Sequence, residues 1–130
     1  NAVIHYINDD QELKSECLIE MANQVWPGAY DVRRIQEAID RTINITAWHG
    51  SKLVGCLRIL SDGYLFGTIT ELLVLKEYQK QGIGRELMQR AMDLTPTPLF
   101  FGAQPEAEGF YEKLGIEKSL QSFYIDKDRN

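Results

Sequence analysis

Two glycines at the point where a strand gives way to a helix offer the clearest chemistry in this sequence. Residues 72 to 75 are an apolar strand, a polar turn leads to Gly82 and Gly84, and helical periodicity runs from residue 83 to 94. Glycine lets a ligand come against the main chain, and the first N–H groups of a helix have no partner inside the helix. Because the helix dipole is also positive at that end, the pattern predicts a site for a phosphate or pyrophosphate.

The spacing of the glycines excludes the two common nucleotide loops. A dinucleotide fingerprint needs a third glycine at the position of Leu87, and a Walker loop needs Lys and Ser or Thr where Arg85 and Glu86 follow Gly84. The predicted phosphate ligand therefore belongs to another class of cofactor.

A second motif, Phe-Tyr-Glu-Lys-Leu-Gly-Ile, occupies residues 110 to 116. One helix and one short apolar strand separate it from the first motif, Gln79-Lys80-Gln81-Gly82-Ile83-Gly84. Together the motifs resemble the GNAT superfamily of acyl-CoA-dependent N-acetyltransferases, with its Gln/Arg-x-x-Gly-x-Gly/Ala signature and its Phe-Tyr-Glu-Lys-Leu-Gly-Phe segment. The resemblance covers residues 44 to 126. Ile116 stands in place of the usual Phe, and Gln104 in place of the usual Asn.

The resemblance implies acetyl-CoA as co-substrate and suggests which residues bind it. The main chain of the strand end would pair with the pantetheine arm, and backbone N–H groups of the turn and first helical residues would hold the pyrophosphate. Gln104 and Tyr111 would contact the cofactor from the second motif. The implied cofactor-binding residues are Leu73, Val74, Leu75, Gln79, Lys80, Gln81, Gly82, Ile83, Gly84, Arg85, Gln104 and Tyr111.

Acetyl transfer to an amine needs a deprotonated amine, a stabilised oxyanion and a protonated leaving thiolate. The resemblance implies Tyr111 as the general acid toward the sulfur; the alternative is an aromatic side chain that only packs on the sheet. Glu71 is the acidic residue within the long strand and could take the amine proton directly or through water, unless strand alternation points it to solvent. Thr68 and Thr70 occupy positions that carry histidines in the arylalkylamine acetyltransferases, so the base of that subfamily is missing.

The resemblance implies that the acceptor amine binds at the mouth opposite the pyrophosphate, between the loop of residues 26–30 and the last hairpin, residues 119–124. Aromatic side chains there could form an apolar or cation–π wall: Trp26, Tyr30, Phe123 and Tyr124. The primary expectation is a small-molecule amine N-acetyltransferase acting by direct attack in a ternary complex. A protein or peptide acetyltransferase and a non-catalytic acetyl-CoA-binding module stay open as alternatives.

Composition narrows the class of protein. The 130 residues carry a net charge of −5, which disfavours a nucleic-acid partner, and no apolar run is long enough to span a membrane. Cys17 and Cys56 are far apart, and His5 and His49 have no partner spacing for a metal, so we expect no disulfide and no metal site. The expectation is a cytoplasmic protein, a single domain over residues 1–130, that is a monomer or homodimer.

The hydrophobic pattern predicts an α/β (α+β) fold. Expected strands cover residues 3–7, 43–48, 53–60, 68–75, 99–102, 116–120 and 122–126. Expected helices cover residues 11–24, capped by Asp9 or Asp10, then 32–40, capped by Asp31, and 83–94, with a further helix carrying Tyr111. The resemblance implies how these elements assemble: a mixed, mostly antiparallel sheet of six to seven strands, helices on both faces, and splayed fourth and fifth strands.

Overall fold

The computed structural model describes residues 2–128 and divides the chain into two compact units, Asn1–Leu99 and Phe100–Asn130. The first unit contains most of the predicted elements. In chain order these are β1 (His5–Ile7), α1 (Ser15–Val25), α2 (Val32–Asp40), β2 (Ile43–His49), β3 (Lys52–Ser61), β4 (Gly67–Val74), the 3-10 turn η1 (Lys76–Tyr78) and α3 (Ile83–Leu94). The predicted α/β class is confirmed.

The strands form one sheet in the order β1-β2-β3-β4-β5, where β5 (Leu99–Phe100) ends the first unit and begins the second. The pairs β1–β2, β2–β3 and β3–β4 are all antiparallel. A two-residue turn with Gly50 at φ +60° joins β2 to β3, which is the hairpin that the sequence predicts. The register of β3 against β4 shifts between Arg58 and Ile59, so β4 carries a bulge next to Glu71.

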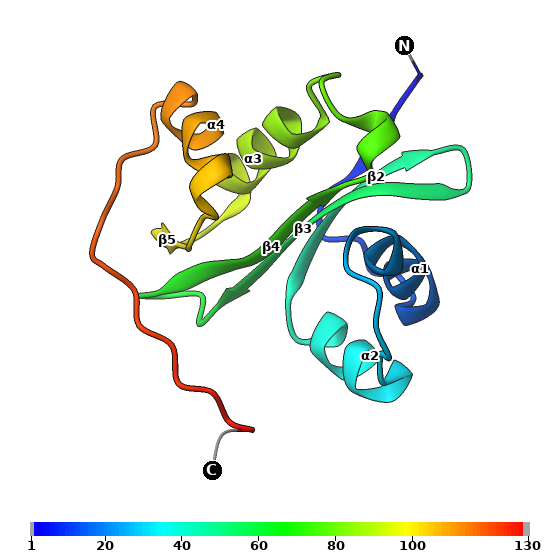
Figure 1. Ribbon diagram of the computed structural model, residues 1–130, viewed down its shortest axis with the longest axis horizontal. Coiled ribbons are helices and arrows are strands. Elements are labelled where there is room, and N and C mark those ends of the chain that lie inside the picture. Colours follow the sequence, from blue (N-terminus) through cyan, green and yellow to red (C-terminus); the bar gives the residue numbers. More distant parts are fainter. Residues whose placement is uncertain (1, 129–130) are drawn as a thin grey trace. The chain divides into compact units, whose positions relative to one another are not determined.

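Helices cover both faces of this sheet, with α1 and α2 on one face and α3 on the other (Figure 1). Helix α3 sits unusually close to the strands because Gly55 has no side chain: a Cβ there would lie 3.1 Å from Ile83 and 3.2 Å from Leu87. The core between sheet and helices is fully buried and almost entirely aliphatic. Its largest members include Leu13, Met21, Ile45, Val54, Leu57, Ile59, Leu75, Ile83, Leu87 and Met88.

One of the two predicted helix caps is confirmed and the other is wrong. The Asp31 carboxylate accepts a hydrogen bond from the backbone N–H of Arg34 at 3.1 Å and begins α2 as expected. Helix α1 instead begins at Ser15, after Lys14, and has no side-chain cap. Asp10 is 4% exposed, and its carboxylate accepts from Thr46 Oγ1 at 2.7 Å and from Trp48 Nε1 at 3.1 Å. Two residues of β2, distant in sequence, thus bind the Asp10 side chain that the local sequence pattern predicted to cap α1.

The second unit contains a 3-10 turn, η2 (Pro105–Ala107), and helix α4 (Glu108–Lys113), which carries Tyr111 as expected. The strands expected at residues 116–120 and 122–126 are wrong, so the described residues form five strands rather than six or seven. Only Gln121 lies between them, so the Gly or Asn of a tight hairpin turn is missing, and an isolated hairpin is only marginally stable. The apolar side chains of this segment are almost fully exposed: Leu120, Phe123, Tyr124 and Ile125.

Candidate active site

The turn between β4 and α3 has the geometry of an anion cradle. Lys80 and Gly82 both adopt left-handed backbone conformations, at φ +64° and +84°, around Gln81. Gly82 is the N-cap of α3 and supplies no side-chain cap, so the first N–H groups of the helix keep their hydrogen-bonding capacity. A Cβ built on Gly82 would meet nothing within 4 Å, which leaves the space before the helix open. Alternating backbone conformations of this kind form anion-binding nests.

The glutamines of the turn have different roles. Gln79 Nε2 donates to the carbonyl oxygen of Val74 at 3.0 Å and so ties the turn to the end of β4. Gln81 Oε1 is buried and has no hydrogen-bond partner among the described residues. An unpaired buried acceptor of this kind needs a hydrogen-bond donor, and an ionised phosphate group supplies none. The open backbone N–H donors before α3, rather than the Gln81 side chain, therefore fit the phosphate-bearing cofactor that the motif predicts.

The end of β4 is paired with β3 on one side. Leu73 and Val74 pair with Cys56 and Gly55 of β3, and the Leu75 N–H donates to the Val54 carbonyl at 2.9 Å. On the other edge, β5 begins beside Gly67, where a Cβ would lie 2.9 Å from Leu99. Since β5 is two residues long and strands rise about 3.3 Å per residue, it cannot reach the level of Leu73. β5 therefore does not cover the end of β4, where the Val74 carbonyl accepts from the Gln79 side chain.

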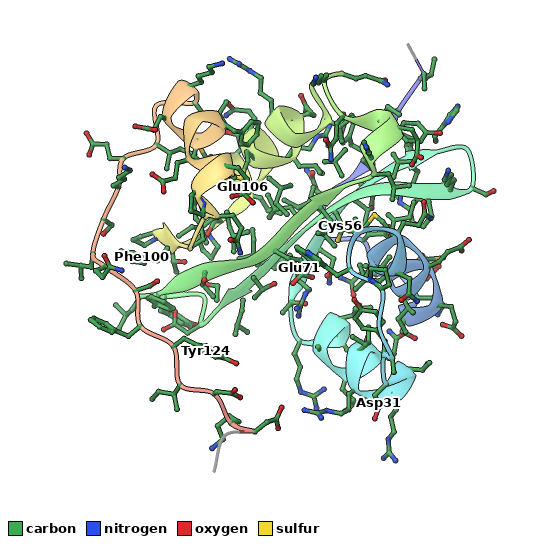
Figure 2. All side chains as sticks on the ribbon, viewed as in Figure 1. Asp31, Cys56, Glu71, Phe100, Glu106 and Tyr124 are labelled. Carbon is green, nitrogen blue, oxygen red and sulfur yellow. The ribbon has the colours of Figure 1, made fainter. Side chains whose placement is uncertain are left out.

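Glu71 points to the face of the sheet that α1 and α2 cover, where it forms a paired charge (Figure 2). Arg58, directly opposite on β3, donates from Nε to Oε2 at 2.8 Å and from Nη2 to Oε1 at 2.9 Å. The bulge also turns Thr70 toward this carboxylate, and Thr70 Oγ1 donates to Oε1 at 3.0 Å. Hydrogen bonding to Glu71 is the main cause of the raised pKa of Arg58.

Glu71 lines a cavity of about 290 Å³ between the sheet and helices α1 and α2. The predicted acceptor residues Trp26 and Tyr30 line the same cavity, so the fold brings these three positions together. The other lining residues are Leu18, Ile19, Ala22, Ile35, Ala38, Ile39, Arg58, Thr70 and Leu73. Arg58 is the charged member that sequence reasoning missed, because its relation to Glu71 depends on the register of β3 against β4.

Tyr111 and Gln104 belong to the second unit. The Tyr111 ring makes edge contacts with Phe101, at 4.9 Å between centroids, and with Phe110, at 5.1 Å. Burial raises the pKa of Tyr111, which keeps the phenol protonated at neutral pH. Phe123 and Tyr124 are 94% and 84% exposed and lie in the segment for which the predicted hairpin is wrong.

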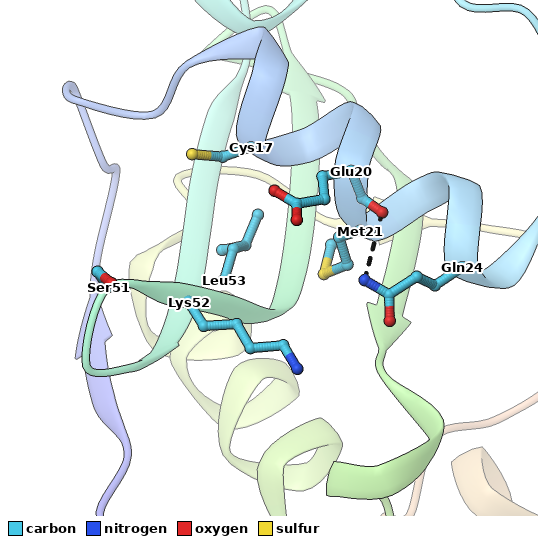
Figure 3. A pocket seen from close by; sticks show the side chains of 7 residues that line it. All are labelled: Cys17, Glu20, Met21, Gln24, Ser51, Lys52 and Leu53. Atoms are coloured by element: carbon cyan, nitrogen blue, oxygen red, sulfur yellow. Dashed lines mark hydrogen bonds between the residues drawn. The ribbon is translucent and has the colours of Figure 1, made fainter.

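Other potentially reactive positions do not form a site. Cys56 is fully buried, and desolvation raises the pKa of its thiol, so it is not a nucleophile. Cys17 lines a small cavity with Glu20, Lys52 and Leu53 (Figure 3), but its volume of about 50 Å³ is too small for an amine substrate. No group of His, Cys, Asp and Glu side chains within residues 2–128 could hold a metal ion.

Comparisons with known proteins agree with this geometry. Residues 9–127 match the model of the Acetyltransferase (GNAT) domain. The chain belongs to the GNAT family. A Bacillus subtilis relative, provisionally named an acetyltransferase, is 31% identical over 87 residues, which cover 64% of this chain and 58% of that protein. The matches span between 27% and 58% of the lengths of the three curated relatives.

Solved structures show the same GNAT fold at low sequence identity. A GNAT-family acetyltransferase of Streptococcus pneumoniae is 23% identical, with a TM-score of 0.77 over 97% of this chain and 100% of its own. An aminoglycoside acetyltransferase from an uncultured soil metagenomic sample, solved in complex with sisomicin, is 17% identical, with a TM-score of 0.68 over 95% of each chain. Among the helices of residues 2–128, none has the length and apolar character needed to cross a membrane.

Proposed function

We propose that this GNAT chain transfers an acetyl group from acetyl-CoA to a primary amine of a small molecule, by direct attack in a ternary complex. One observation carries the proposal: a single strand, β4, both leads to the anion cradle and lines the cavity. Its end leads through η1 to the anion cradle before α3, and its middle places Glu71 on the wall of the cavity with Trp26 and Tyr30. A strand that joins a phosphate site to a small, mostly apolar cavity suits a thioester donor and an amine acceptor.

Acetyl-CoA is the co-substrate that the family implies. In the proposal, backbone N–H groups from Gln81 to Arg85 bind its pyrophosphate, with Lys80 adding a positive charge at the cradle. The main chain of Leu73, Val74 and Leu75 is proposed to pair with its pantetheine arm, which would compete with the Gln79 side chain for the Val74 carbonyl. Gln104 is proposed as a further cofactor contact from the second unit.

The proposed chemistry is a single displacement at the thioester carbonyl. The amine nitrogen attacks the carbonyl carbon, the C–S bond breaks, and the Tyr111 hydroxyl gives its proton to the departing thiolate. The raised pKa of Tyr111 suits this role, because an acid must hold its proton until the sulfur needs it.

The proton leaving the amine is proposed to go to water rather than to Glu71. A proton on Glu71 would disrupt two charge-assisted hydrogen bonds from Arg58, at 2.8 and 2.9 Å, which are stronger than neutral ones. Glu71 then orients the polar wall of the acceptor cavity, and its sequence-based role as base is replaced by a positioning role.

The acceptor is proposed to be a small molecule because the cavity is small and is lined by side chains from α1, α2, the loop between them, β3 and β4. A protein substrate would need an open groove. The aminoglycoside acetyltransferase shares the fold, yet its substrate carries several ammonium groups, and this cavity contains one carboxylate, already paired with Arg58.

The test is release of free CoA thiol from acetyl-CoA with a panel of small amines and lysine-containing peptides. We expect turnover with at least one small amine and about 10²-fold less with the Tyr111→Phe enzyme. Turnover with peptides alone would establish the protein-acetylating alternative. Tight acetyl-CoA binding without turnover on any amine would establish a non-catalytic module.

A further inference from the structure

The two hydroxyl groups of the acceptor cavity already donate to other atoms of the protein. The Tyr30 hydroxyl donates to the backbone carbonyl of Trp26, and the Thr70 hydroxyl donates to Glu71 at 3.0 Å. Most of the remaining wall is aliphatic, from Leu18, Ile19, Ala22, Ile35, Ala38, Ile39 and Leu73. A ligand with many hydroxyl or ammonium groups would lose water contacts here without replacing them, which is costly.

The charges of the cavity cancel each other. Arg58 and Glu71 form a two-bond ion pair, and their side chains are only 19% and 21% exposed. In such a partly desolvated setting a bare carboxylate would attract cations strongly, whereas the paired one presents a net charge of zero. Arg58 therefore removes the attraction that a multiply charged amine would otherwise find at Glu71.

We propose that the acceptor is a monoamine with an apolar body that fills this cavity, and that Arg58 is the specificity-determining residue that excludes polyamines and amino sugars. The inference rests on the proposed function, since it names the substrate class of the same site. The proposed specificity has two causes. The aliphatic wall favours the apolar part of a monoamine, and the Glu71 carboxylate, neutralised by Arg58, does not compensate the charges of a polycation. A cavity of about 290 Å³ corresponds to the small end of ligand sites and suits a single ring or a short chain.

The experiment compares kcat/KM for 2-phenylethylamine and for spermidine as acetyl acceptors. In the wild-type enzyme we expect a ratio of at least tenfold in favour of 2-phenylethylamine. Arg58→Gln exposes the Glu71 charge and should lower this ratio about tenfold, which corresponds to ~1.4 kcal/mol. Glu71→Gln leaves the Arg58 charge uncompensated and should raise the ratio. A purely structural role would reduce both substrates alike and leave the ratio unchanged.

Arg41→Gln is the matched control. It also removes one arginine from an ion pair, with Glu37 at 3.1 Å, but both side chains of that pair are at least 60% exposed. This variant should keep the wild-type ratio. A wild-type preference for spermidine, or an unchanged ratio in both cavity variants, would overturn the proposal. If either Arg58→Gln or Glu71→Gln fails to fold, the change of the ratio expected for the other variant remains the test.

Direct binding separates this inference from the proposed function. In isothermal titration calorimetry, 2-phenylethylamine should bind the wild-type protein more tightly than spermidine does, whether or not turnover follows. Ala38→Leu, which fills part of the cavity from α2, should weaken 2-phenylethylamine binding at least fivefold. Selective binding without CoA release would reject the transferase and keep the cavity assignment. Turnover of a monoamine with unchanged binding in Ala38→Leu would keep the transferase and reject the cavity as its acceptor site.

Discussion

At the scale of single residues, the chemistry available to a side chain depends on the group opposite it. Glu71 lies across from Arg58 on the neighbouring strand, and both of its oxygens accept charge-assisted hydrogen bonds. A carboxylate held in this way is well placed to shape a cavity wall and poorly placed to accept a proton. The pair therefore bears on both the mechanism and the substrate.

The proton route makes a prediction for Glu71→Gln. If Glu71 positions Arg58, the variant should lose about tenfold in kcat/KM at every pH, because the near-isosteric amide keeps the shape of the side chain but loses the ion pair. The pH profile should keep its shape and continue to rise toward the pKa of the amine, about 10.4 for an alkylamine. The check is a kcat/KM titration from neutral to alkaline pH. A plateau that is present in the wild type and absent from the variant would restore Glu71 as the base.

Tyr111 makes a second residue-scale prediction. Burial raises the pKa of Tyr111, so the proton-donating form is retained below its ordinary pKa of about 10 and is lost only as the pH rises through the higher folded-state value. Tyr111→Phe keeps the ring contacts with Phe101 and Phe110 and removes only the hydroxyl. We expect kcat to fall about 10²-fold while acetyl-CoA affinity is unchanged. Equal losses of kcat and affinity would indicate a positioning role instead.

At the scale of elements, the cradle depends on backbone conformation more than on side chains. Gly82 has φ +84° and open space where a Cβ would stand. Gly82→Asp should abolish the thermal shift produced by acetyl-CoA, because it places a side chain and a negative charge among the N–H donors. Gly82→Ala is the control: it should cost about 1 kcal/mol of stability through backbone strain but keep part of the shift. Acetyl-CoA binding that survives Gly82→Asp would move the cofactor site away from this turn.

The two aspartates near helix starts make a second element-scale prediction. Asp10 is buried and accepts from Thr46, from Trp48 and from the backbone N–H of Glu12. Asp10→Ala removes all three bonds, although the Trp48 N–H keeps Thr46 Oγ1 as an acceptor, and should destabilise the fold by about 2–3 kcal/mol. Asp31 is an exposed cap, so Asp31→Ala should cost about 1 kcal/mol. Urea denaturation of the two variants checks the order. A larger loss of stability for Asp31→Ala than for Asp10→Ala would mean that the hydrogen bonds between Asp10 and β2 contribute little to stability.

At the scale of the whole molecule, the prediction concerns cofactor choice. Acetyl-CoA at about 100 times its Kd should stabilise the native protein by about 2.7 kcal/mol. For a chain of this size that corresponds to a rise in melting temperature of roughly 8–10 °C. NAD and ATP should give no comparable shift, because the turn lacks the residues of their loops. A shift with NAD or ATP and none with acetyl-CoA would contradict the proposed function.

Local sequence determined the elements that carry the cradle. The apolar run before Gly82 and the helical stripe after it are periodic patterns, and the structure has β4 and α3 where those patterns predict them. The Asp31 cap and the hairpin at Gly50 followed from the same kind of short-range rule. These features depend on contacts between residues close in the chain, so the sequence alone was sufficient to place them.

Tertiary structure alone decided the rest, because it depends on partners distant in sequence. The register of β3 against β4, with its bulge beside Glu71, sets Arg58 opposite that carboxylate and turns Thr70 toward it. Asp10 found its partners on β2 rather than at a helix start. The segment from 116 to 126 has the alternation of strands but no ladder partner among the described residues. The alternation of apolar and polar residues indicates only which face of a strand could be buried. A segment becomes a strand only when it pairs with the edge of a neighbouring strand.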